Sequence, residues 1–132
     1  MFEHRWAARD PEAMGLPGNL ADVTVDGVLG ALAHATAGAA YLEWTRYRAA
    51  AELHTRLVAP LDSTDRRRFD ATTHCAARIA AVLSITQGAG EGILTRAVAL
   101  RDRLPDVAAC LRDGLVTPKY IHTIIARTDL VD

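Results

Sequence analysis

The sequence has few of the residues that build disulfide frameworks and aromatic cores. It contains two cysteines and only 5% aromatic residues. Cys75 and Cys110 stand far apart without a CxxC spacing, which argues against a disulfide-rich secreted protein. The chain also lacks an apolar run long enough for a membrane span or a signal peptide. From these absences we expect a cytoplasmic protein with no membrane partner.

An excess of charge of either sign is also missing. The 15 basic and 16 acidic residues give a formal net charge of −1, which excludes a strongly basic nucleic-acid coat and an acidic tail. Lys119 is the single lysine, so nearly all the positive charge is on arginine, the side chain that pairs best with phosphate groups. With this balance, we expect any binding to DNA to be weak at physiological salt.

Small aliphatic residues are abundant. Half of the 132 residues are hydrophobic and 25 are alanine. Such thin side chains suit closely packed helices and disfavour a β-sandwich. The composition and the spacing of the apolar residues therefore predict an all-α fold, a helical array of about five helices with one long N-terminal helix.

The first part of the chain divides into an arm and a long helix. Residues 1–22 contain several prolines and glycines that break any periodicity, and we expect a flexible N-terminal arm there. The partial helical domain then occupies 23–132. Its first helix is predicted over 25–58, with an apolar face from Leu29 to Leu57 at three-to-four spacing. Two helices broken near Gly38 are the alternative.

Shorter helices follow this long one. Residues 66–103 predict a helix-turn-helix-like unit, whose first helix has an apolar stripe that begins at Phe69. Residues 105–128 predict a helical hairpin, with Gly114 just after its first helix and the pair Thr117-Pro118 at the start of its second.

The helix-turn-helix pattern is clearest between residues 76 and 97. Ile79 and Leu83 make the first helix apolar, and Ile85 lies in a three-residue turn. Ala80 provides the small side chain that two steeply crossing helices need where they come closest. In helix-turn-helix proteins the second helix of such a unit enters the major groove of DNA.

The candidate DNA contacts are basic or polar side chains around this unit. The arginine run before it provides the best phosphate clamp, and the second helix offers one glutamine for a base edge. Glu91 and three glycines weaken that helix as a recognition element. The candidate contacts are Arg66, Arg67, Arg68, Thr86, Gln87 and Arg96.

One stretch of the chain resembles a known family. The segments are ALRDRLP, ending at Pro105, then LRDG, ending at Gly114, and then a helix started by Thr117 that contains His122. This order resembles the 13E12 repeat family of actinobacteria, built on domain of unknown function 222. The likeness extends from about residue 62 to 128 and is weaker over 39–58.

The resemblance implies a helical domain whose biochemical role is not established. Longer members of the family often carry a C-terminal His-Asn-His nuclease module, which implies that the helical domain positions DNA or regulates a nuclease. Set against such members, this chain corresponds to the N-terminal part only. We therefore expect a truncated member without the nuclease.

No catalytic arrangement is predicted. A His-Asn-His site needs an asparagine, and the single one, Asn19, lies in a proline- and glycine-rich loop. We also expect no cofactor and no metal site, since the histidines and cysteines have no standard ligand spacing.

The sequence thus predicts a non-catalytic helical domain with a degenerate helix-turn-helix and a weak association with DNA. Two alternatives remain. One is a protein-interaction or oligomerisation module that self-associates through apolar helix faces. The other is a remnant with no retained activity.

Overall fold

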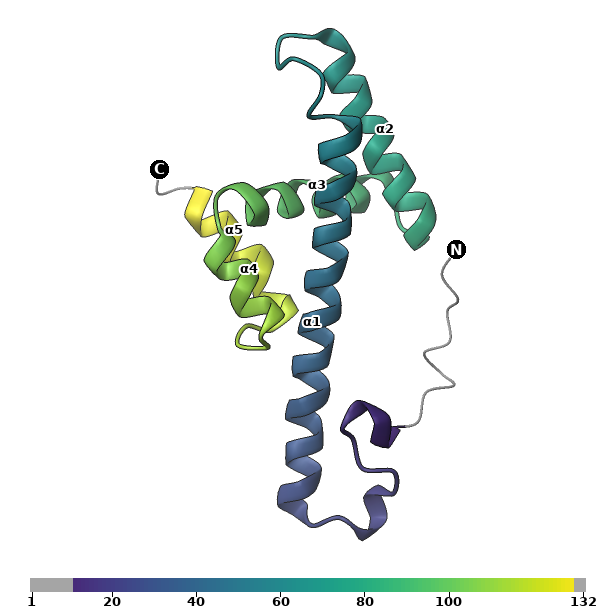
Figure 1. Ribbon diagram of the computed structural model, residues 1–132, viewed down its shortest axis with the longest axis vertical. Helices are drawn as coiled ribbons and strands as arrows, with labels where there is room; N and C mark the ends of the chain where they lie inside the picture. The colour runs from purple at the N-terminus through teal and green to yellow at the C-terminus, as the bar shows by residue number, and fades with distance from the viewer. Residues whose placement is uncertain (1–10, 130–132) are drawn as a thin grey trace.

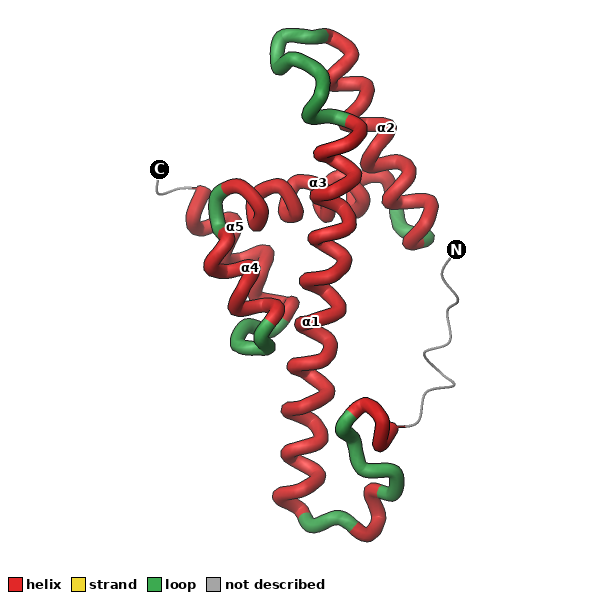
Figure 2. The backbone as a smooth tube through the Cα atoms, in the orientation of Figure 1, coloured by secondary structure: helices red, strands yellow, loops and turns green. Residues whose placement is uncertain are grey.

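The computed structural model describes residues 11–129, and within this range the chain forms helices and connecting loops (Figures 1 and 2). The predicted all-α class, with a long first helix and about five helices, is confirmed. The α-helices are α1 (Val25–Leu57), α2 (Arg66–Leu83), α3 (Gln87–Asp102), α4 (Pro105–Arg112) and α5 (Ile121–Asp129). The shorter 3-10 turns are η2 (Pro11–Met14), η3 (Leu20–Asp22) and η4 (Pro118–Tyr120). None of the helices in this range is long and apolar enough to cross a membrane.

Helix α1 is one continuous helix. Thr24 caps its start, because the Thr24 hydroxyl accepts a hydrogen bond from the Gly27 N–H at 3.1 Å. The helix continues through Gly38 and ends shortly before Pro60. The prediction of a single long helix is correct, and the alternative of a break near Gly38 is wrong. Its 33 residues extend over about 50 Å at 1.5 Å per residue.

The other helices pack around the C-terminal half of α1. Helix α3 runs across α1 and contacts both α1 and α2, and α4 contacts α1 and α3 (Figure 1). The N-terminal half of α1 extends past this cluster, with η2 and η3 beside it. Of the predicted flexible arm, residues 1–10 lie outside the described residues. The rest forms η2 and η3, and the Met14 carbonyl lies 2.9 Å from Nε2 of His34 on α1.

The buried face of α1 differs from the predicted one. The sequence pattern placed large aliphatic residues on the inner side. Leu29 lies on the buried side but beyond the packing helices and is 57% exposed, and Leu42 points away from that side and is 43% exposed. The residues that α1 buries are instead three alanines and one tyrosine, namely Ala40, Tyr47, Ala50 and Ala51. Small side chains occupy this face because they let α3 and α4 come close to the α1 backbone.

Helix α2 shows the same kind of difference. Phe69, predicted to start its apolar stripe, is 76% exposed. The face that α2 buries consists of Cys75, Ala76, Ile79 and Ala80. The buried stripe therefore begins six residues later than predicted.

Candidate functional site

The predicted helix-turn-helix-like unit corresponds to α2, a tight turn and α3. Ser84 adopts a left-handed conformation with φ of 55° and ends α2, and Thr86 caps α3 by accepting a hydrogen bond from the Ala89 N–H at 3.1 Å. Ala80 lies at the closest approach of the two helices, as predicted. Its neighbour across the crossing is Gly90, where an added Cβ would lie 2.6 Å from the Ala76 carbonyl oxygen. Close packing thus requires this glycine, regardless of any contact with DNA.

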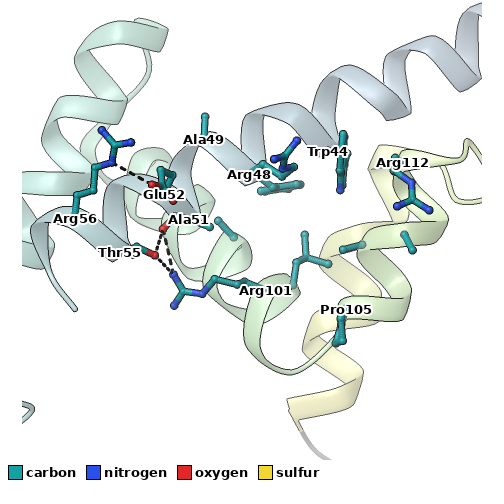
Figure 3. Close-up of a pocket in the computed structure, with 15 residues that line it drawn as sticks. Trp44, Arg48, Ala49, Ala51, Glu52, Thr55, Arg56, Arg101, Pro105 and Arg112 are labelled. Carbon is teal, nitrogen blue, oxygen red and sulfur yellow. Dashed lines mark hydrogen bonds and ion pairs between the residues drawn. The ribbon is translucent and has the colours of Figure 1, made fainter. Parts of the chain in front are cut away.

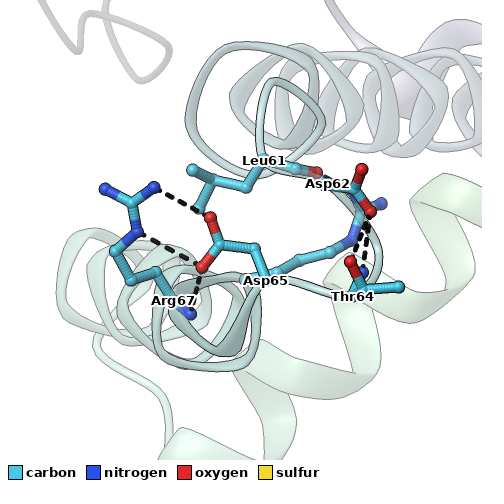
Figure 4. Close-up of polar contacts among 6 residues, drawn as sticks. Leu61, Asp62, Thr64, Asp65 and Arg67 are labelled. Carbon is cyan, nitrogen blue, oxygen red and sulfur yellow. Dashed lines mark hydrogen bonds and ion pairs between the residues drawn. The ribbon is translucent and has the colours of Figure 1, made fainter.

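Two of the three arginines at the start of α2 make polar contacts within the protein. Arg67 forms an ion pair with Asp65, 2.8 Å apart, and Asp65 also caps α2 through the Arg67 N–H (Figure 4). The Arg68 guanidinium donates a hydrogen bond to the Leu61 carbonyl. Arg66 is exposed, and its side chain makes no ion pair or hydrogen bond with any other residue in 11–129. Of the three arginines, only Arg66 is unengaged.

The three candidate contacts on α3 are also engaged in local structure. Thr86 is the cap described above. Gln87 donates hydrogen bonds to the Thr73 carbonyl and to the Glu91 carboxylate, both at 3.2 Å. Arg96 points toward α1, where its Nε donates to the Tyr47 hydroxyl at 3.0 Å. The structure therefore does not bring the six candidate residues together into one surface.

A different group of arginines does converge, on a groove between α1, α3 and α4. The groove has a volume of about 790 Å³, which lies within the range of small-molecule sites (Figure 3). Its inner surface is largely apolar and includes Ala97, Leu100 and Pro105. Four arginines and a single glutamate, Glu52, supply its charged lining. We call this feature the arginine groove; its arginines are Arg48, Arg56, Arg101 and Arg112.

Trp44 forms part of the groove wall between two of these arginines (Figure 3). The guanidinium carbon of Arg48 lies 4.8 Å from the Trp44 ring centroid, and that of Arg112 lies 5.9 Å from it. The face of an indole attracts cations, so the ring interacts favourably with both guanidinium groups. Arg112 also pairs with Asp113 at 2.9 Å, whereas Arg48 has no acidic partner among the described residues.

Arg101 fastens α3 to α1 at the other end of the groove. One of its terminal nitrogens donates to the Ala51 carbonyl at 3.1 Å and to the Thr55 hydroxyl at 3.0 Å (Figure 3). Its Nε pairs with Asp102 at 2.7 Å, and this hydrogen bond lowers the pKa of the Asp102 carboxyl group. Because Arg101 already has several partners inside the protein, its main role is to position the two helices.

His54 lies beside this arginine. Its Nδ1 is 3.3 Å from a terminal nitrogen of Arg101. Partial burial lowers the pKa of His54, and the positive charges of Arg101 and Arg68 lower it further, while Asp102 acts in the opposite direction. The neutral imidazole is thus the form that fits the folded protein.

We expect acidification to destabilise the domain through His54. The unfolded chain binds this proton near the ordinary value of about 6.5, but the folded chain binds it only at lower pH. Between these two values the unfolded state holds more protons, so the free energy of unfolding decreases as pH falls. Urea unfolding at a series of pH values measures this dependence. His54→Gln should flatten it, and the exposed control His122→Gln should not; equal curves for the two variants would contradict the prediction.

The sequence carried part of the signal for the groove. Trp44, Arg48, Glu52 and Arg56 follow one another at intervals of four, so they share one face of α1. Arg112 lies 56 residues after Arg56 in the sequence, and only the docking of α4 brings it close to Trp44. The groove residues were therefore missed as a set.

The described residues outside the groove offer no metal site, and the thiol of Cys75 is not a reactive one. In 11–129 there is no group of three or more His, Cys, Asp or Glu side chains that could hold a metal ion. Burial raises the pKa of the Cys75 thiol, which keeps it in the unreactive protonated form.

Comparison with known protein families finds a match over most of the chain. A family model described as a domain of unknown function, DUF222, matches residues 32–132. This range includes α2 to α5, most of α1 and every residue of the arginine groove. No curated protein matches the chain, nor does any solved structure. Because the model covers well over half of the sequence, the chain belongs to the DUF222 family.

Proposed function

We propose that this domain is a non-catalytic module that associates with DNA through the arginine groove. The observation that carries the proposal is the convergence of four arginines from three helices on one groove. Arg48 has no acidic partner in 11–129, whereas the other three are ion-paired with Glu52, Asp102 and Asp113. A local concentration of positive charge can bind phosphates even where the net charge of the chain is −1.

Within the groove, Arg48 and Arg112 are the best candidates for phosphate contacts. Arg48 has no acidic partner among residues 11–129, and the side chain of Arg112 is 45% exposed beside Asp113. Trp44 fixes both guanidinium groups through cation–π contacts, so less side-chain entropy is lost when they meet a phosphate. Arg56 lies two turns beyond Arg48 on α1, about 12 Å away, but it pairs with Glu52 at 3.1 Å and so adds little free positive charge.

The start of α3 is a poor alternative surface. Its exposed side includes Gln87 and Glu91, which are hydrogen-bonded to each other, and Arg96 is turned toward Tyr47. A carboxylate at this position would repel DNA phosphates. We therefore assign the recognition role to the groove and a packing role to the helix-turn-helix-like unit.

Salt-dependent binding of a labelled DNA duplex tests this proposal. We expect the double variant Arg48→Gln with Arg112→Gln to bind about 10-fold more weakly at low salt. The slope of log affinity against log salt should decrease by about 2, because two phosphate contacts are lost. Fluorescence anisotropy over a range of salt concentrations measures both quantities.

Two control variants make the result specific. Arg46→Gln with Arg78→Gln removes the same charge from a smaller pocket between α1 and α2, and should leave the slope unchanged. Arg66→Ala with Arg67→Ala tests the arginine run at the start of α2. The groove is not the interface if this last pair abolishes binding while the groove variant binds normally. A wild-type chain that does not bind DNA at low salt would instead support an interaction module or a remnant without activity.

A further inference from the structure

The N-terminal half of α1 has an apolar stripe that no described residue covers. Val25, Leu29 and Leu32 are 78%, 57% and 62% exposed. Their spacing of four and then three residues places them on one side of the helix. Continued along α1 in steps of three or four residues, the stripe leads through Thr36 to Ala40 and Tyr47, which are buried. The stripe is thus an extension of the face that α1 uses to pack in its C-terminal half.

The turns that precede α1 do not cover this stripe. They contact α1 at His34, whose Nε2 lies near the Met14 carbonyl. Gly15 packs so closely on the same ring that an added Cβ would lie 2.8 Å from it. His34 lies two residues after Leu32, which corresponds to a rotation of about 200° around the helix. The preceding turns therefore occupy the opposite side of α1, beside its protruding half in Figure 1.

The charge of this half of α1 restricts the kind of partner. Between residues 25 and 42 the only charged side chain is Asp26, with His34 as the one other titratable group apart from Tyr41. A strongly acidic or basic partner would find almost nothing to pair with here. A partner that is itself apolar and nearly uncharged fits, and the same segment of a second copy has these properties.

We propose that this stripe is a self-association surface, on which the N-terminal halves of two α1 helices pair antiparallel. A two-fold axis between Leu29 and Leu32 would place Leu29 of each copy against Leu32 of the other. The two Asp26 carboxylates would then lie about 14 Å apart along the helices, beyond the screening length of about 8 Å at physiological salt. A parallel pair would instead bring these carboxylates and the two positive helix ends together.

The available area is consistent with a reversible dimer. A specific interface needs about 1,000 Å² in total, or about 500 Å² from each copy. Three large aliphatic side chains that are each more than half exposed supply most of this area on each side, with Val28 and Thr36 at the edges. The interface is therefore at the small end of the stable range, and the dimer should form at micromolar concentrations.

Sedimentation velocity of the whole chain over a range of concentrations tests the proposal. We expect a monomer–dimer equilibrium whose dissociation constant rises by about 100-fold in Leu29→Glu with Leu32→Glu, because unpaired carboxylates would be buried against apolar side chains. The control Phe69→Glu with Val82→Glu alters two α2 side chains that are 76% and 83% exposed, and it should dimerise like the wild type. Circular dichroism confirms that all variants keep their helices.

Disulfide cross-linking of cysteine variants tests the antiparallel orientation of the two α1 helices. In a Cys110→Ala background, a mixture of the Leu29→Cys and Leu32→Cys variants should form an intermolecular disulfide on oxidation, whereas Val25→Cys should not, since its two copies lie far apart in the antiparallel pair. A wild-type chain that stays monomeric at all concentrations would overturn the proposal. Dimerisation that survives the two glutamates, or a disulfide formed by Val25→Cys, would also overturn it.

Discussion

Replacing Gly90 by alanine is expected to destabilise the domain by about 2 kcal/mol, although alanine is the better helix former by about 1 kcal/mol. The added Cβ would lie 2.6 Å from the Ala76 carbonyl oxygen and 3.0 Å from the Ala80 Cβ. The first of these atoms belongs to the backbone of α2, so the clash can be relieved only if the two helices move apart. Thermal unfolding followed by circular dichroism should show a midpoint lowered by about 8 °C.

Gly88 provides the matched control in the same helix. A Cβ added at Gly88 meets nothing within 4 Å. Gly88→Ala should therefore leave stability unchanged or raise it by up to about 1 kcal/mol, because alanine restricts the unfolded chain. If Gly90→Ala were as stable as Gly88→Ala, the close crossing of α2 and α3 would be incorrect.

Truncating Leu111 to alanine is expected to cost about 3 kcal/mol, within the usual range for a fully buried leucine. Leu111 is 0% exposed and lies on α4, which has only eight residues. A helix of this length has little stability of its own and depends on packing against α1 and α3. Loss of this side chain should therefore loosen α4 and, with it, the Arg112 wall of the groove.

Urea unfolding measures this effect, and Leu115 is the control. Leu115 lies four residues later and is 76% exposed, so Leu115→Ala removes the same atoms from a site that contributes little burial. Its free energy of unfolding should change by less than about 0.5 kcal/mol. Similar losses for the two variants would show that α4 is not held by Leu111.

Local chemistry explains why the helix boundaries could be predicted. Thr24, Asp65 and Thr86 each accept a backbone hydrogen bond at the start of a helix, and each precedes a helical pattern in the sequence. Gly114 takes a positive φ of 76° just after α4, as expected for a residue at that position. These interactions span only a few residues, so the sequence contains all their participants.

The faces of the helices were harder to predict. In α1 the large aliphatic residues suggested one buried side, but the closely packed side carries Ala40, Ala50 and Ala51. The choice depends on where α3 and α4 dock, because a close crossing selects small side chains over large ones. Periodicity alone cannot show that the other helices dock only on the C-terminal half of α1, which leaves Leu29 exposed on the same side of the helix.

The candidate site also combines features that local sequence predicts with features that depend on how the helices pack. The all-α class, the long first helix and the family resemblance could be predicted from the sequence, because they depend on patterns of neighbouring residues. Only the docking of the helices brings Arg96 to Tyr47 and Arg112 to the ring of Trp44. These pairs are separated by dozens of residues along the chain, so their contacts exist only after the helices have docked.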